Sequence, residues 1–101
     1  MNNPNYSKEA LSDLDNIYSN VLEASKDHDT ANKYINDLLD TLEAKSNIPK
    51  TGTPLYYDGL FSGYYYVVFK AYIAFYYVEN DTIFVDRILF GKSDYLRVLF
   101  P

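Results

Sequence analysis

The fold is decided by the stretch from Gly63 to Asp94, which reads GYYYVVFKAYIAFYYVENDTIFVDRILFGKSD. It holds three apolar segments rich in Tyr, Phe, Val and Ile, the residue types that pack well on a pleated, half-buried surface. Each segment has 6 to 9 residues, a length typical of strands rather than helices. The segments are Tyr64–Phe69, Tyr72–Val78 and Thr82–Phe90. Asn80-Asp81, before the last segment, can adopt the positive φ of a tight hairpin, so we predict an antiparallel meander of three strands.

Two amphipathic helices are predicted before this sheet. Apolar residues recur at steps of three and four over Lys8–Ser25, and Ser7 is the expected N-cap. The same pattern restarts after a polar link, where Asp29 or Thr30 is the expected N-cap, and it continues to about Lys45. Because the link is short, we expect the two helices to form an antiparallel hairpin. Their apolar stripes must also pack on the sheet.

The other segments contain residues that favour turns. Residues 48–63 include two Pro and three Gly, so they are predicted to form a loop, with a short extended piece at Leu55–Tyr57. After the last strand, Ser93 or Asp94 is the expected cap of a short turn over residues 95–100. The predicted fold class is therefore α+β, with an N-terminal antiparallel helical hairpin packed on a small antiparallel β-sheet.

The composition predicts one small domain covering residues 1–101, led by a short extended or frayed segment at Met1–Asn5. There is no cysteine, which excludes disulfides and a thiolate zinc site. The only histidine, His28, lies in the polar link between the helices, and we expect neither a metal nor a small-molecule cofactor. The N-terminus lacks the apolar segment of a signal peptide, and no apolar run approaches the roughly 20 residues of a membrane helix. We therefore expect a soluble cytoplasmic protein with no membrane partner.

The order of these elements and several of their residues resemble the RelE/ParE superfamily, the toxins of type II toxin–antitoxin pairs. The opening helix, from Tyr6 to Ile17, reads YSKEALSDLDNI and is similar to that of the family. The strongest resemblance is at residues 72–100, YIAFYYVENDTIFVDRILFGKSDYLRVLF, which look like the family's aromatic strand, hairpin, final strand and ending. The resemblance implies the RelE/ParE fold, growth inhibition, a role in plasmid stabilisation and neutralisation by a cognate antitoxin protein.

The departures from the family pattern bear on the target. Members that cleave mRNA on the ribosome carry basic residues on the middle strands and in the ending, together with a late Tyr. At those positions this chain resembles them poorly, because it has Ile73, Ser93 and Leu99, and it has Phe90 where the family has a His. The resemblance therefore favours DNA gyrase, the target of the ParE branch. The alternatives are a metal-independent, ribosome-dependent mRNA endonuclease and a toxin-like binding module without toxicity. The net charge of −5 gives weight to the last, because a nucleic-acid binder usually has a basic surplus.

The sequence contains candidate residues for target binding, for catalysis and for antitoxin binding. The target-binding candidates are the cations of the sheet half, Lys70, Arg87, Lys92 and Arg97. If the chain cleaves RNA, Arg87, Lys92 and Tyr95 are the candidate catalytic residues, with a cation to stabilise the phosphorane and a Tyr as a weak acid. The candidate antitoxin-binding residues are Tyr64, Tyr66 and Tyr76, because an exposed aromatic sheet face marks a binding surface. Arg87 is expected to pair with a carboxylate such as Asp86 or Asp94, or to face a functional groove, and Asp13 is expected on the solvated face of its helix.

Overall fold

The computed structural model describes residues 3–101, so Met1 and Asn2, the start of the predicted lead-in, lie outside the described residues. The chain forms three α-helices, one 3-10 turn and five strands within that range. In chain order they are β1 (Asn5–Tyr6), α1 (Lys8–Ser25), α2 (His28–Ser46), η1 (Pro49–Thr51), β2 (Thr53–Tyr57), β3 (Leu60–Phe69), β4 (Tyr72–Glu79), β5 (Thr82–Phe90) and α3 (Tyr95–Leu99). No helix in residues 3–101 is long and apolar enough to cross a bilayer.

Capping hydrogen bonds set the ends of the two long helices. The Ser7 hydroxyl accepts a hydrogen bond from the backbone N–H of Ala10 at 2.9 Å, which confirms Ser7 as the N-cap of α1. Helix α1 ends at Ser25 and is capped by Lys26, whose backbone is left-handed and whose N–H donates to the Leu22 carbonyl. The prediction of Asp29 or Thr30 as the second N-cap was wrong, because the Asp27 carboxylate accepts the hydrogen bond from the Asp29 N–H. Helix α2 therefore starts earlier, at His28.

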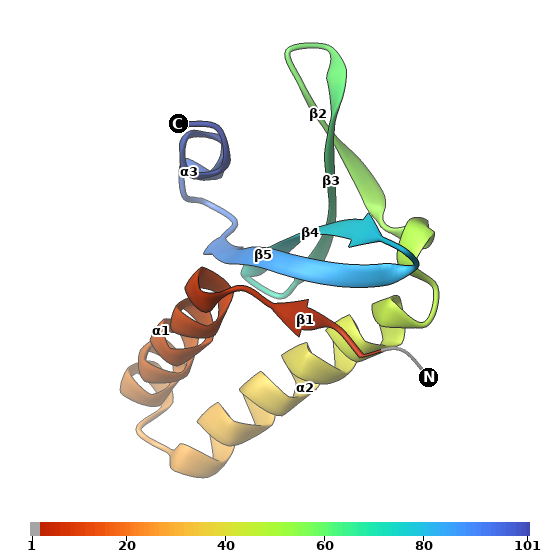
Figure 1. Cartoon of the computed structure of the whole chain (residues 1–101). Coiled ribbons are helices and arrows are strands. Elements are labelled where there is room, and N and C mark those ends of the chain that lie inside the picture. Colours follow the sequence, from red (N-terminus) through yellow and green to blue (C-terminus); the bar gives the residue numbers. More distant parts are fainter. Residues whose placement is uncertain (1–2) are drawn as a thin grey trace.

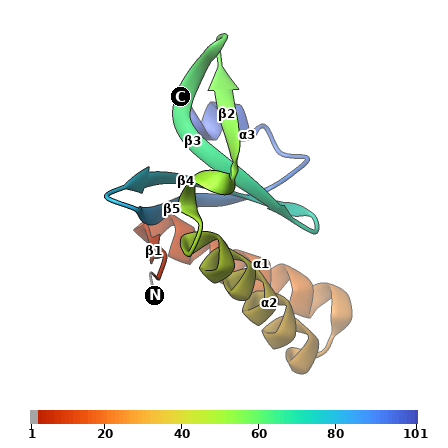
Figure 2. The ribbon, with the colours of Figure 1, turned by 90° about the vertical axis from the view of Figure 1, so that its right-hand side faces the viewer.

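The sheet has five strands in the order β1-β5-β4-β3-β2, two more than predicted. The segment predicted as a loop contains β2, which includes the extended piece expected at Leu55–Tyr57, and the first residues of β3. The two strands pair antiparallel around a turn at Asp58 and Gly59. Both turn residues have positive φ, 58° and 80°, as a two-residue hairpin requires. The sheet is mixed rather than purely antiparallel, because the two-residue β1 pairs parallel to β5. The β2–β3 hairpin extends away from the helices as a projecting arm (Figures 1 and 2).

Helices α1 and α2 lie together against one face of the sheet, as Figure 2 shows. Alternate strand residues point into this layer and meet the apolar stripes of the helices. The buried core lies between the two layers. Its fully or almost fully buried members are Ala10, Ile17, Leu38, Leu42, Ala74, Tyr76, Ile83, Val85 and Ile88. The predicted α+β layering is therefore confirmed, and this buried cluster lies on the helix-covered side of the sheet.

The opposite face of the sheet carries much less cover. It holds the remaining strand residues, and only the five-residue α3 lies over part of it (Figure 1). The Tyr95 ring of α3 packs on Phe75 with centroids 5.2 Å apart, and Phe100 stacks on Tyr57 at 4.2 Å. No residue of α3 is buried. We call this surface the open face, and define it by Tyr64, Tyr66, Phe75, Tyr77, Phe84 and Asp86.

Candidate interaction surfaces

Arg87 is held in a bidentate ion pair with Asp13 of α1. Its Nε and one terminal nitrogen donate to the two carboxylate oxygens of Asp13 at 2.8 and 3.0 Å. The same carboxylate accepts the backbone N–H of Ile88 at 2.9 Å. Arg87 therefore pairs with a carboxylate, as one of the two expectations had it, but the partner is Asp13 rather than Asp86 or Asp94. The expectation that Asp13 lies on the solvated face of its helix was wrong, because its side chain is only 9% exposed. The hydrogen bond to Asp13 raises the pKa of Arg87, so this cation remains charged and fixes α1 to β5.

A β-bulge interrupts β5 at its two neighbouring charges, Asp86 and Arg87. Tyr76 pairs with Val85 and Phe75 pairs with Arg87, so Asp86 is the extra residue on the bulged strand. A bulge locally bends a strand and redirects its side chains. Here Arg87 reaches α1, whereas the Asp86 carboxylate accepts a hydrogen bond from the Tyr64 hydroxyl at 2.8 Å. The two side chains thus bind different partners, although the Asp86 charge still acts on Arg87 and helps to raise its pKa.

The other predicted target-binding cations lie at one end of the sheet and on α3. Lys70 is exposed in the β3–β4 turn, where its Nζ lies 4.8 Å from the centre of the Tyr34 ring. Lys92 is exposed in the turn after β5. These two turns are joined, because the Gly91 N–H donates to the Ala71 carbonyl at 2.8 Å. Arg97 stands apart on α3 and pairs with Asp94 on the surface. The structure therefore brings the Lys70 and Lys92 turns together and leaves Arg87 and Arg97 engaged elsewhere.

The three tyrosines predicted to bind an antitoxin divide between the two faces. Tyr76 is completely buried under the helices, and its hydroxyl donates to the Pro49 carbonyl at 3.4 Å. A contact between Tyr76 and an antitoxin does not fit this structure, because its side chain offers no surface. Tyr64 and Tyr66 are half-buried on the open face, where Tyr66 lies against Phe75 with centroids 6.3 Å apart. Tyr95, the predicted weak acid, packs on the same Phe75 ring.

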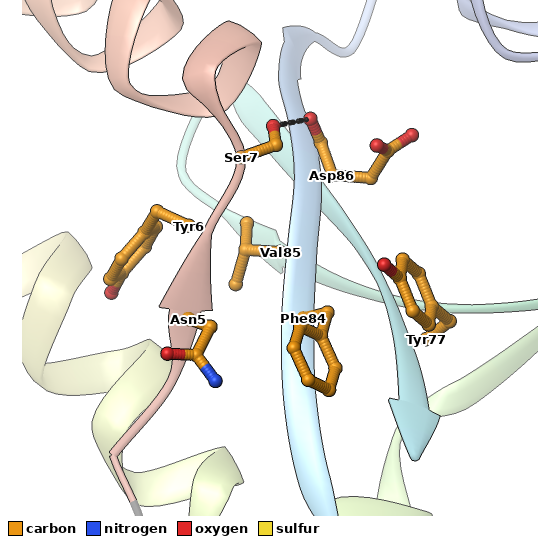
Figure 3. Close-up of a pocket in the computed structure, with 7 residues that line it drawn as sticks. All are labelled: Asn5, Tyr6, Ser7, Tyr77, Phe84, Val85 and Asp86. Atoms are coloured by element: carbon orange, nitrogen blue, oxygen red, sulfur yellow. Dashed lines mark hydrogen bonds between the residues drawn. The ribbon is translucent and has the colours of Figure 1, made fainter.

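A cavity of about 250 Å³ lies where β1, β5 and β4 meet (Figure 3). Its lining includes Asn5, Tyr77, Phe84 and Asp86. The Tyr77 and Phe84 rings stack at 5.3 Å and are 11° from parallel. Burial, with the nearby Asp86 carboxylate, raises the pKa of Tyr64 to about 12, so its hydroxyl stays protonated and continues to donate. This part of the open face combines flat aromatic rings with negative charge.

The exposed tip of the β2–β3 hairpin was missed by the sequence interpretation. Four large side chains there are 43% to 73% exposed. They are Tyr56, Tyr57, Leu60 and Phe61. The signal was present, because an Asp-Gly pair flanked by apolar residues is a strong indication of a hairpin. It was obscured by Pro54 and the glycines around it, which also favour loops. No group of three or more His, Asp or Glu side chains suited to a metal occurs in the described part of the chain.

The comparisons with solved structures agree with this architecture. The structure entitled "Chromosomal ParDE TA system from P. aeruginosa" superposes with a TM-score of 0.74 at 18% identity, and the match covers 89% of this chain and 96% of that one. The RelB–RelE antitoxin–toxin complex from Methanococcus jannaschii gives a TM-score of 0.56 at 18% identity, covering 96% and 99% of the two chains. At this identity the two structures show a shared fold. No curated protein sequence matches the chain significantly.

The sequence itself matches a family model. The description of that family is "ParE toxin of type II toxin-antitoxin system, parDE", and the match runs over residues 5–95, from β1 to the start of α3. It therefore includes the helical hairpin, the whole sheet and the Asp13–Arg87 ion pair. The chain belongs to the ParE toxin family of type II toxin–antitoxin systems, within the RelE/ParE superfamily.

Proposed function

We propose that this toxin arrests growth by acting on DNA gyrase in the cytoplasm, and that a cognate antitoxin neutralises it. The observation that carries the choice of gyrase over RNA is the placement of the cations. RNA cleavage without a metal needs a base, an acid and a cation at one phosphate. Here Arg87 is bound to Asp13, and Arg97 is bound to Asp94. The open face presents aromatic rings and the Asp86 carboxylate, which would repel a phosphate.

We propose that Lys70 and Lys92 make the main polar contact with the target, and that Arg97 adds a weaker one. The support is their exposure and the hydrogen bond that joins the two lysine turns. Two exposed lysines on adjoining turns can contact a carboxylate or phosphate without breaking any described ion pair. Arg97 would first have to leave Asp94, although an exposed pair of this kind is worth little.

For the antitoxin, we propose a segment that folds on binding and covers the hairpin tip and the open face. An extended or helical segment gains most by covering apolar surface that the free protein leaves exposed. Such surface occurs at Tyr56, Leu60 and Phe61 and continues to the half-buried Tyr64 and Tyr66. Of the two solved relatives, one comes from a ParDE TA system and the other is an antitoxin–toxin complex.

A growth assay tests the first step. The chain is expressed in bacteria from a tightly controlled promoter, alone and together with the small gene that neighbours it. We expect arrest with the chain alone and normal growth when both genes are expressed. Normal growth with the chain alone, at a verified protein level, would favour the toxin-like binding module without toxicity.

Purified components test the target. We expect the protein to inhibit supercoiling by gyrase, or to accumulate cleaved DNA, while mRNA on stalled ribosomes stays intact. Cleavage of ribosome-bound mRNA with unchanged gyrase activity would contradict the proposal. That result would support the endonuclease alternative, in which Lys92 and Tyr95 are the first residues to test.

Paired lysine variants test the contact residues. The variant Lys70→Ala with Lys92→Ala is expected to lose at least about tenfold in potency against gyrase, since each lost contact to a charged group is worth about 1.5 kcal/mol or more. The matched control is Lys8→Ala with Lys33→Ala, which removes the same charge from exposed positions on the helices. Equal potency of the two double variants would show that general charge, rather than the lysine turns, sets the activity.

A further inference from the structure

The Asp86 carboxylate on the open face forms no ion pair with a described cation, although its charge acts on the neighbouring Arg87. Its Oδ2 accepts the Tyr64 hydroxyl, and no described group donates to its Oδ1. The ion pairs within 4.0 Å among the described side chains do not include Asp86. The adjacent Arg87 is committed to Asp13. A partly buried carboxylate with an unused oxygen is a strong acceptor for a charged donor.

Aromatic rings line the same cavity as Asp86. Tyr77 and Phe84 stack on each other and both line the cavity of about 250 Å³ shown in Figure 3. The Tyr64 ring meets Tyr77 edge-on, with centroids 6.3 Å apart and planes at 77°. Ring faces attract cations, and the planar guanidinium group stacks on them better than an ammonium does. The same cavity reaches Asn5, whose side-chain amide lies beside Phe84 in Figure 3.

We propose that this cavity binds an arginine side chain of a partner protein, with the guanidinium group on Asp86 Oδ1 and against the Tyr77 and Phe84 rings. Charge decides between ligand classes, because the carboxylate and the net charge of −5 disfavour an anionic ligand. The planar aromatic lining favours arginine over lysine. The Tyr64 hydroxyl holds the carboxylate in place for this contact, which reduces the ordering cost of binding. The site depends on these residues alone and stands whether or not gyrase is the target.

Small probes can test the site in the intact protein. N-acetyl-arginine amide is titrated into the ¹⁵N-labelled full chain at low salt, and backbone amide shifts are followed. We expect saturable shifts at Phe84, Asp86 and Asn5, with a dissociation constant on the order of 1–10 mM for this isolated side chain. N-acetyl-citrulline amide, which has nearly the same shape without the charge, should shift these signals about tenfold less. N-acetyl-lysine amide should bind more weakly than the arginine probe.

Two variants decide whether the carboxylate and the rings act as proposed. Asp86→Asn keeps an acceptor for Tyr64 and should weaken arginine binding about tenfold, as expected for a lost charge-assisted hydrogen bond. Asp58→Asn is the control, since it removes one carboxylate from the exposed hairpin turn, and it should leave binding unchanged. Phe84→Leu keeps the carboxylate and should weaken binding through the loss of the ring.

Several results would overturn the proposal. These are the absence of shifts at Phe84 and Asp86, equal binding of the citrulline or lysine probe, and unchanged affinity in either Asp86→Asn or Phe84→Leu. Unfolding measured by circular dichroism checks that the variants remain folded. Should Asp86→Asn fail to fold, the Phe84→Leu titration gives the decision by itself.

Discussion

The two faces of the sheet are built from the same strands and similar residues, but they differ in how much of each side chain is exposed to solvent. On the helix-covered face, Ala74, Tyr76 and Val85 are at most 1% exposed. On the open face, Tyr64, Tyr66 and Tyr77 all keep exposed surface, and only Phe75 is completely buried there. Residue type does not explain the difference, since tyrosines occupy both faces.

The difference in exposure comes from the helices that cover each face. Helices α1 and α2, of 18 and 19 residues, lie on one face, whereas the five-residue α3 lies on the other. Strand alternation sends neighbouring aromatic residues to opposite faces, so a sheet covered on one side must leave half of them partly exposed. One face therefore holds the buried cluster under the helices, and the other leaves rings and charge partly exposed.

The largest expected difference between the faces concerns two tyrosines. Tyr76→Ala should lower the free energy of unfolding by about 4 kcal/mol, because it removes a fully buried ring from the core. Tyr66→Ala, on the open face, should cost less than about half as much, since its ring is only half-buried. Urea unfolding of both variants measures this. Equal losses would show that the open face contributes to stability as much as the covered one does.

The next effect tests the ion pair at the edge of the sheet. Asp13→Ala leaves both the Arg87 guanidinium and the Ile88 N–H without their partner, so it should cost about 3 kcal/mol of unfolding free energy. Asp15→Ala on the exposed side of the same helix is the control, and should change stability by no more than about 0.5 kcal/mol. A loss in Asp13→Ala as small as that of the control would mean that the ion pair is not formed in solution.

Removal of α3 should have a smaller effect, since none of its residues is buried. A variant that ends at Asp94 loses the Tyr95–Phe75 and Phe100–Tyr57 ring contacts, and it should be less stable by about 1–2 kcal/mol. In the intact chain, hydrogen exchange at the amides of residues 95–99 should be much faster than in β4. If these amides exchange as slowly as those of β4, α3 belongs to the cooperative core.

The smallest effect is on pH dependence. In the folded protein the pKa of Tyr64 is raised to about 12, and burial also raises that of Tyr6 to about 12, so their neutral forms stabilise the native state. This stability is fully present below the ordinary pKa of 10 and should be lost as the pH rises from 10 to 12. Tyr64→Phe should cost about 1 kcal/mol at pH 7, through the hydrogen bond to Asp86, and make the alkaline loss shallower. Unfolding curves between pH 7 and 12 test the prediction, and an unchanged slope in Tyr64→Phe would contradict it.

The spacing of apolar residues along the chain was sufficient to predict the long helices and the central strands. The predicted bounds of α1 and β5 match the structure, because their periodic apolar residues and their caps act locally. Strand β1 could not be predicted, since two residues carry no periodicity and pair with β5 only after the chain has folded. The sequence could not tell that Tyr76 lies on the face under the two long helices and Tyr66 on the open face. The position of α3 and of the long helices on the sheet is not encoded in neighbouring segments of the chain.

The sequence by itself determined the two amphipathic helices, the aromatic strands and the family to which they point, because these depend on local periodicity and turn chemistry. The tertiary structure alone decided the partners of the charges. Asp13 and Arg87 are 74 positions apart, and the bulge at Asp86 changes which way β5 presents its side chains. Such contacts depend on how helix and sheet pack in three dimensions, and no spacing along the chain encodes them. For that reason Arg87 is bound to Asp13 of α1, while Asp86 is hydrogen-bonded to Tyr64 on the open face.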